Sequence, residues 1–224
     1  MCIRDSVDWV RRRLDRAGIQ VRRVLDFGCG VGHGIPELLD RLRAQEVIGV
    51  DVSEPMLALA RKNYGSSRTR FMSPEAACDT GPFDLAFTTG VFHHIPPADR
   101  PNAVRLILRA LRPDGALAFW ENNPWNPLMR LSMSRVRFDK DAITISPPEA
   151  VRLLRDGGFE VIDTSFRFLF PRLLAPLRVL EPALSPMPIG AQYLVWCRKP
   201  IGAPAAISAD KSSPVSSAGR AQPA

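Results

Sequence analysis

The chain has 224 residues, of which 46% are hydrophobic, and its formal net charge at pH 7 is +7. This length and apolar content suffice for the core of a single domain. The sequence has no run of the roughly 18 to 20 apolar residues that a membrane span requires, and no apolar segment follows a basic start as in a signal peptide.

The four cysteines are scattered and form no C-x-x-C pair, so their spacing suggests neither a disulfide framework nor a zinc site. We therefore expect a reduced, cytoplasmic protein without a bound metal. A basic chain can bind nucleic acid or an anionic membrane surface. Because the sequence shows no RNA-binding motif and no interleaved aromatic residues, we expect no nucleic-acid partner.

Apolar periodicity and turn signals predict an alternation of helices and strands. The start, MCIRDS, shows no periodicity and is interpreted as a doubtful N-terminal remnant, residues 1–6. The expected helices have apolar residues at helical spacing or plausible cap residues, and they span 7–18, 35–42, 53–65, 98–111 and 146–158. The expected strands are short apolar runs, and they span 23–27, 46–51, 69–73, 83–89, 116–121, 159–170 and 192–199.

This alternation predicts an α/β fold, a Rossmann-like, doubly wound and mostly parallel seven-stranded sheet with helices on both faces. The predicted domain spans residues 7–200. Segments 121–148 and 171–190 are irregular and proline-containing, and we expect them to be insertions or a lid beside the binding site. Residues 201–224 are mostly Ala, Ser and Pro and are predicted to be a disordered tail.

The stretch VLDFGCGVGHG, residues 24–34, has four glycines directly after the first expected strand. Ligands of such sheets bind beyond the carboxyl ends of the strands. The dinucleotide fingerprint G-x-G-x-x-G fails in both registers, because its third glycine falls on His33 or Ile35. The Walker pattern fails as well, since no G-K-[ST] follows.

What remains is D-x-G-x-G-x-G, formed by Asp26 and the glycines at 28, 30 and 32, and it resembles the first motif of class I S-adenosylmethionine-dependent methyltransferases. VIGVDVSEPML, with Asp51 at the end of the second strand, is similar to the family's second motif. FDLAFTTGVFHHI and LRPDGALAF resemble its fourth-strand and fifth-strand motifs. The four motifs stand in the family's order and cover roughly residues 20 to 120.

The resemblance implies S-adenosylmethionine as the cofactor. Asp26 would orient the ammonium group of the cofactor's amino-acid tail, and Asp51 would accept hydrogen bonds from both ribose hydroxyls. Val52 and Met56 would flank the adenine. Glu75 or Ala76 would line its edge, although MSPEAACDTG departs from the family's usual acidic loop. The full set of expected cofactor-binding residues is Asp26, Gly28, Cys29, Gly30, Gly32, Asp51, Val52, Met56, Glu75 and Thr89.

His93 and His94 follow the fourth strand and are candidates for a catalytic base. The alternative is that they only form hydrogen bonds within the loop. ENNPWNPLMR suits a polar ligand, and its candidate substrate residues are Glu121, Asn123, Trp125, Asn126 and Arg130. The alternative for this stretch is a proline-pinned loop whose amides bind the backbone.

The apolar segment 168–189 is interpreted as core or a lid, with a dimer surface and peripheral membrane contact as alternatives. We expect the protein to be a methyltransferase that acts on a small-molecule acceptor, lipid-linked or a saccharide. A non-catalytic protein that binds S-adenosylmethionine with the same fold is the alternative. A nicotinamide oxidoreductase is a third interpretation, which His33 and Ile35 disfavour.

Overall fold

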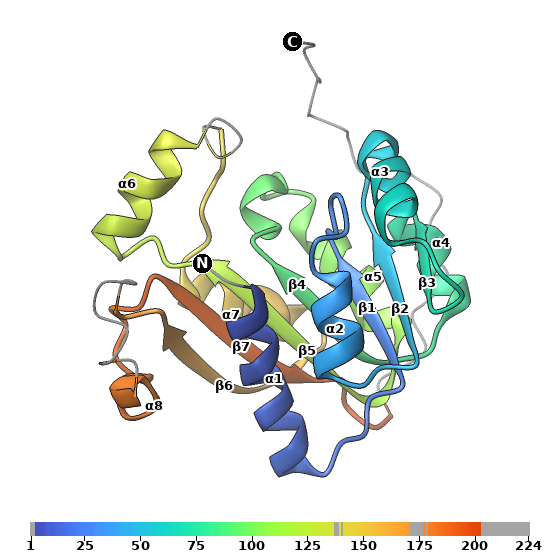
Figure 1. Ribbon diagram of the computed structural model, residues 1–224. Coiled ribbons are helices and arrows are strands. Elements are labelled where there is room, and N and C mark those ends of the chain that lie inside the picture. The colour runs from blue at the N-terminus through green and yellow to red at the C-terminus, as the bar shows by residue number, and fades with distance from the viewer. Residues whose placement is uncertain (1–2, 137–138, 140, 171–176, 178, 203–224) are drawn as a thin grey trace.

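The computed structural model of the protein describes residues 3–136, 139, 141–170, 177 and 179–202. Its centre is a seven-stranded sheet with the order β3-β2-β1-β4-β5-β7-β6 (Figure 1). The strands are β1 (Arg23–Phe27), β2 (Glu46–Val50), β3 (Thr69–Met72), β4 (Phe83–Thr89), β5 (Leu111–Asn122), β6 (Glu160–Arg167) and β7 (Gln192–Arg198). The helices are α1 (Ile3–Ala17), α2 (Ile35–Arg41), α3 (Glu54–Tyr64), α4 (Pro74–Thr80), η1 (Phe92–His94), α5 (Arg100–Ala110), α6 (Pro127–Arg135), α7 (Pro147–Asp156) and α8 (Glu181–Leu184).

Strands β1 to β5 pair in parallel, and β7 is antiparallel to both of its neighbours, β5 and β6. The predicted fold class, a doubly wound and mostly parallel seven-stranded sheet, is therefore confirmed. The order reverses between β1 and β4, whose carboxyl ends lie side by side. In sheets of this kind the reversal opens a crevice for ligands.

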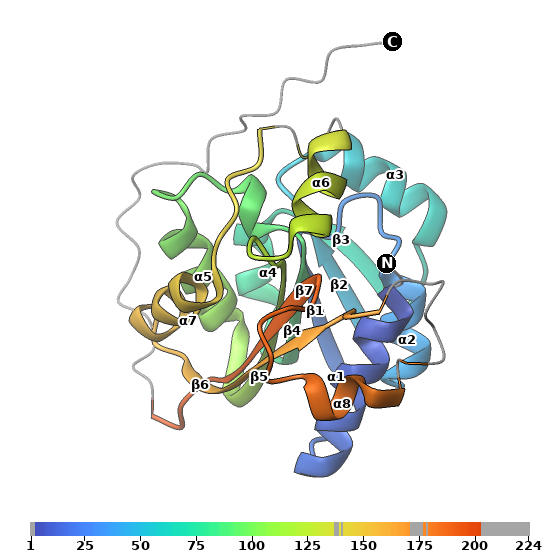
Figure 2. The ribbon, with the colours of Figure 1, turned by 90° about the vertical axis from the view of Figure 1, so that its left-hand side faces the viewer.

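Helices cover both faces of the sheet, as Figure 2 shows from the side. Helices α1, α2 and α3 bury residues such as Val10, Leu38 and Leu57 against one face. Helices α5 and α7 bury Ile107 and Leu154 against the other. Because the central strands are covered on both sides, four of the five residues of β1 and of β2 are buried, as is usual for parallel strands.

Several elements differ from the expectation. Helix α1 begins at Ile3 instead of residue 7, and its first turn is tied to the domain by the pairing of Arg4 with Glu37. Helices α4 and α6 form where the sequence was read as loop. At α6 the side chain of Asn126 accepts a hydrogen bond from the Met129 backbone, and a proline follows this cap, a common way to begin a helix.

None of the helices in the described part of the chain is long and apolar enough to cross a membrane. The predicted lid at 171–190 falls partly outside the described residues, since 171–176 and 178 are not among them. The same holds for positions 203–224 of the predicted tail.

Candidate active site

The glycine-rich turn after β1 forms the centre of the site. Gly28, Gly30 and Gly32 all have positive φ angles, 77°, 52° and 86°, a conformation that costs other residues steric energy. The backbone N–H groups of Gly28 and Cys29 donate hydrogen bonds to the carbonyl of Val50 at 2.8 and 2.9 Å. The turn is therefore held against the carboxyl end of β2.

The three glycines have different neighbours. A Cβ atom at Gly28 would lie 2.4 Å from Cγ2 of Val91, and one at Gly32 would lie 2.8 Å from the ring of Tyr64. At Gly30 the nearest atom is Sδ of Met56, at 3.8 Å. Gly28 and Gly32 thus allow other parts of the protein to approach, and of the three only Gly30 has room for a Cβ, which would make an ordinary van der Waals contact with Met56.

Asp51 follows β2 and links the end of that strand to the glycine turn. Its Oδ2 accepts a hydrogen bond from the backbone N–H of Gly30, and its Oδ1 accepts one from that of Ser53, both at 2.9 Å. A carboxylate oxygen has two lone pairs, so each oxygen can accept one more hydrogen bond. The expected pair of ribose hydroxyls therefore fits these two oxygens.

Asp26, near the end of β1, is only 4% exposed, and its side chain forms no hydrogen bond with any described residue. Burial, with a smaller contribution from the nearby charge of Asp51, raises its pKa from 3.8 to about 7. Its Oδ2 lies 3.2 Å from the position of a Cβ at Gly34. A buried carboxyl group without a partner, beside the glycine turn, fits the ammonium group expected there.

The remaining cofactor candidates lie around the same turn, with one exception. Val52 is 55% exposed, and Met56 is half-buried beside Gly30. Thr89 is the last residue of β4. Cys29 is partly buried, and burial together with Asp26 and Asp51 raises the pKa of its thiol, so it is no nucleophile. Glu75 instead lies exposed in the first turn of α4.

Glu121 at the end of β5 organises the loop that follows β4. Its Oε1 accepts hydrogen bonds from the backbone N–H groups of Val91 and Phe92, at 2.9 and 2.7 Å. Its Oε2 lies 2.7 Å from Nδ1 of His93. Both side chains are buried, at 1% and 3% exposure. These contacts give Glu121 a structural role, and its contact with a substrate stays a prediction.

The two histidines differ in their surroundings. Burial pulls the pKa of His93 down, but the hydrogen bond and charge of Glu121, together with Asp139, outweigh it, and the net shift is upward. Burial and the charge of His93 lower the pKa of His94, whose side chain is 28% exposed. His94 is therefore the more accessible and the more readily deprotonated of the two predicted bases.

Sequence reasoning missed two residues that complete this cluster. Asp139, after α6, lies 3.6 Å from Nε2 of His93 and 3.4 Å from Nε2 of His94, measured to its Oδ1. The buried guanidinium of Arg100 donates to the carbonyls of Phe92 and Ile95 at 3.1 and 3.0 Å and to that of Ile143. No local signal marks either residue, because their partners are far apart in the sequence.

The other candidate substrate residues fall into two groups. Asn123 and Asn126 form hydrogen bonds with the backbone, as expected for a loop held by prolines, whereas Trp125 and Arg130 lie exposed. Asn123 is fully buried, and its side-chain amide donates to the carbonyls of Pro188 and Gly190. The side chain of Asn126 caps α6 and donates to the carbonyl of Ile189. Arg130 is exposed, and Trp125 is 51% exposed with its ring stacked near Phe166.

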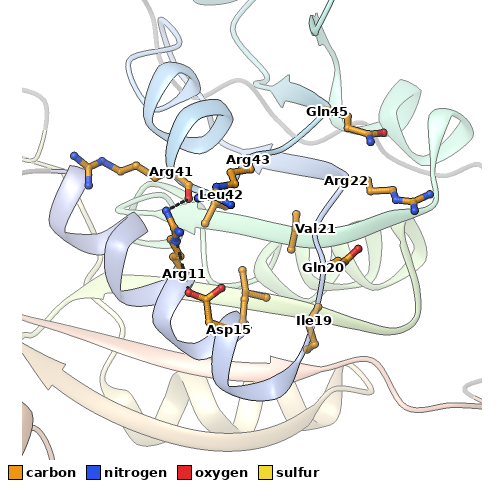
Figure 3. Close-up of a pocket in the computed structure, with 11 residues that line it drawn as sticks. Arg11, Asp15, Ile19, Gln20, Val21, Arg22, Arg41, Leu42, Arg43 and Gln45 are labelled. Atoms are coloured by element: carbon orange, nitrogen blue, oxygen red, sulfur yellow. Dashed lines mark hydrogen bonds and ion pairs between the residues drawn. The ribbon is translucent and has the colours of Figure 1, made fainter.

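Two hollows are lined by residues outside the glycine turn. Figure 3 shows a cavity of about 380 Å³ between α1 and the segments that precede β1 and β2, at the amino ends of the strands. None of the predicted site residues lines it. The second, of about 310 Å³, is largely apolar and lies beside α7 and β6; its lining residues are Trp125, Pro147, Pro148, Val151, Thr164, Phe166, Pro186 and Pro188.

The chain is similar in sequence to known methyltransferases over part of its length. Residues 24–115 match a family model described as a methyltransferase domain. Trans-aconitate 2-methyltransferase of Azoarcus sp. (strain BH72) is 35% identical over 95 residues, 42% of this chain and 37% of that protein. Thiocyanate methyltransferase 1 of Arabidopsis thaliana is 34% identical over 110 residues, 46% of this chain and 48% of that protein. The chain thus matches less than half the length of either relative.

Among solved structures, a SAM-dependent methyltransferase from Archaeoglobus fulgidus is similar with a TM-score of 0.61 and 19% identity. The likeness covers 86% of this chain and 94% of that one. At this level of identity, the likeness shows the fold.

Proposed function

We propose that the protein is a class I S-adenosylmethionine-dependent methyltransferase and transfers the methyl group of this cofactor to a small-molecule acceptor. The match of residues 24–115 to a methyltransferase-domain model, the methyltransferase relatives and the fold support this proposal. The observation that carries the proposal is the buried carboxyl group of Asp26 at the glycine turn, where its Oδ2 lies 3.2 Å from the position of a Cβ at Gly34. The cofactor supplies an electrophilic methyl group on a sulfonium.

The residues around the glycine turn would bind and orient the cofactor. Asp26 would pair with the ammonium group, which favours the ionised carboxylate and offsets its burial. Asp51 would accept the ribose hydroxyls while its backbone hydrogen bonds keep the turn in place. Methyl transfer depends on the alignment of nucleophile, carbon and sulfur, so a rigid turn of this kind contributes through positioning.

The family match leaves the acceptor open, since the two relatives named above differ in the acceptors that their names give. We propose an acceptor with an apolar part, because the apolar hollow beside Trp125 lies next to the segment that leaves β5. Exposed apolar side chains at Leu177, Val179 and Leu180 support the finer proposal of a lipid-linked acceptor reached at a membrane surface.

The test is turnover. The protein is incubated with S-adenosylmethionine and a panel of thiols, phenols, quinols and carboxylic acids, with short-chain and long-chain members of each class. S-adenosylhomocysteine formed above the level of the Asp51→Ala variant, and more readily with apolar acceptors, would support both proposals. Cofactor binding without turnover on any member would favour the alternative, a non-catalytic protein that binds the cofactor.

A further inference from the structure

Three potential metal ligands converge at the loop after β4. One ring nitrogen of His93, one of His94 and a carboxylate oxygen of Asp139 all lie within 4.8 Å of one another. Oδ1 of Asp139 is 3.6 Å from Nε2 of His93 and 3.4 Å from Nε2 of His94. These two separations are ion-pair distances and are longer than a typical hydrogen bond.

The separations do match a shared cation. Ligands at about 2.0 to 2.2 Å from a tetrahedral zinc ion lie about 3.3 to 3.6 Å from one another. Two imidazole nitrogens and one carboxylate oxygen are a set that divalent transition metals prefer over magnesium or calcium. Three protein ligands leave one position of a tetrahedral ion open.

Glu121 holds His93 in the orientation that a metal ligand needs. Oε1 of Glu121 already accepts two backbone hydrogen bonds, and Oε2 faces Nδ1 of His93 at 2.7 Å. An ionised carboxylate only accepts hydrogen bonds, so Nδ1 of His93 carries the proton. The lone pair of the neutral ring is then on Nε2, the atom that faces Asp139. A carboxylate behind a ligating histidine is the usual support of such a ligand.

The two loops that carry the ligands are fastened to each other. The backbone N–H of Ile143 donates to the carbonyl of His93 at 2.8 Å. Arg100 bonds the carbonyls of Phe92, Ile95 and Ile143 and so holds both loops. A divalent cation between the two histidines and Asp139 would also be attracted to the carboxylates of Asp139 and Glu121, which already contact these histidines.

We propose that His93, His94 and Asp139 bind one divalent transition-metal ion of the zinc type, with Glu121 as the positioning residue behind His93. The expectation of no metal rested on cysteine spacing alone, and these ligands contain no cysteine. With its Nε2 on the metal, His94 is a ligand and no general base. The proposal concerns metal binding and does not depend on the identity of the methyl acceptor.

The test uses the full chain, treated with a chelator and then dialysed. Titration with Zn²⁺ by calorimetry should give one site per chain, and Co²⁺ should give the visible absorption of a low-coordinate site. His94→Ala and Asp139→Ala, two partly exposed positions, should each weaken Zn²⁺ binding at least about tenfold. His33→Ala is the matched control, since the third histidine of the chain lies beside Tyr64, and it should leave binding unchanged.

Two results would overturn the proposal. One is the lack of saturable Zn²⁺ binding by the wild-type protein, which would make His93 a cation between two carboxylates. The other is binding that His94→Ala and Asp139→Ala leave unchanged, which would place the ion elsewhere. Thermal unfolding in chelator verifies that both variants fold, so that lost binding is not lost structure.

Discussion

Val91 fills the space in which a side chain at Gly28 would have to lie, with its Cγ2 atom 2.4 Å from the position of that Cβ. The first glycine of the motif is thus required by the loop after β4, and Gly30 is the glycine that has room for a Cβ. The requirement for bare backbone therefore has two causes within one motif, packing at Gly28 and ligand access at Gly30.

Alanine substitutions separate these two causes. Gly28→Ala adds a clash with Val91 to the cost of a positive φ, and we expect a loss of about 2 to 5 kcal/mol in the free energy of unfolding. Gly30→Ala should cost only about 1 to 2 kcal/mol but should weaken binding of S-adenosylhomocysteine. Urea unfolding and calorimetric titration measure the two effects.

Gly18→Ala is the matched control for both variants, since Gly18 has a φ of 67° and no neighbour within 4 Å of its Cβ position. It should cost about as much stability as Gly30→Ala and leave ligand affinity unchanged. Equal effects of Gly30→Ala and Gly18→Ala on binding would contradict the role given to Gly30.

Asp26 should make the stability of the ligand-free protein depend on pH. The pKa of Asp26 is about 7 in the folded protein, against an ordinary value of 3.8, so between these two pH values the folded state holds a proton that the unfolded state has lost. Stability therefore falls as pH rises from about 4 to about 7. Urea unfolding across this range should show the decline, and Asp26→Asn should remove that part of it.

The same carboxyl group should release a proton when the cofactor binds near pH 7. Pairing with an ammonium group lowers the pKa of Asp26, so the group ionises on binding. Calorimetric titrations with S-adenosylhomocysteine in buffers of different ionisation enthalpy measure the number of protons released. Asp26→Asn should abolish this release, and an unchanged number in the variant would refute the assignment.

Asp51→Ala should weaken binding of S-adenosylhomocysteine by about 1.5 to 3 kcal/mol, the scale of hydrogen bonds to a charged group. This corresponds to about a 10- to 150-fold rise in the dissociation constant. Asp79→Ala, which removes a 76% exposed carboxylate paired with Arg109, should leave the constant unchanged. A folded Asp51→Ala protein with wild-type affinity would show that this carboxylate does not contact the ligand.

Glu121→Ala should lower the free energy of unfolding by about 3 to 5 kcal/mol, because it removes the buried partner of His93 and the acceptor of two backbone N–H groups. Glu54→Ala breaks a surface pair with Arg61, and because solvent screens this pair, the stability should stay close to that of the wild type. If both variants lost a similar amount of free energy of unfolding, the buried contacts of Glu121 would not be the cause of its effect on stability.

The sheet could be predicted from the sequence because its signals are local. Each parallel strand is a short apolar run between turn residues, and the glycine turn is identified by its residue types alone. Helices α4 and α6 were missed although Ser73 and Asn126, each followed by proline, are typical helix starts. The prolines of ENNPWNP indicate a loop, whereas the Asn126 cap indicates the start of a helix, and the structure follows the cap.

The surroundings of the histidines could not be predicted from the sequence in the same way. The contacts of His93 with Glu121 and Asp139, and those of Arg100 with Ile143, depend on where three separate loops meet. The polar residues of ENNPWNP could have been substrate contacts or part of a loop held by its own hydrogen bonds. The hydrogen bonds from Asn123 to the carbonyls of Pro188 and Gly190 distinguish the two interpretations. Two of the candidate substrate residues, Glu121 and Asn123, are buried and form internal hydrogen bonds.

The most direct test of the central claim is calorimetric titration of the purified chain with S-adenosylhomocysteine, with NADH as the control. We expect micromolar binding of S-adenosylhomocysteine and none of NADH. Binding of NADH would contradict the assignment of the glycine turn to this cofactor. So would the binding of neither compound, provided that the protein unfolds cooperatively and is therefore folded.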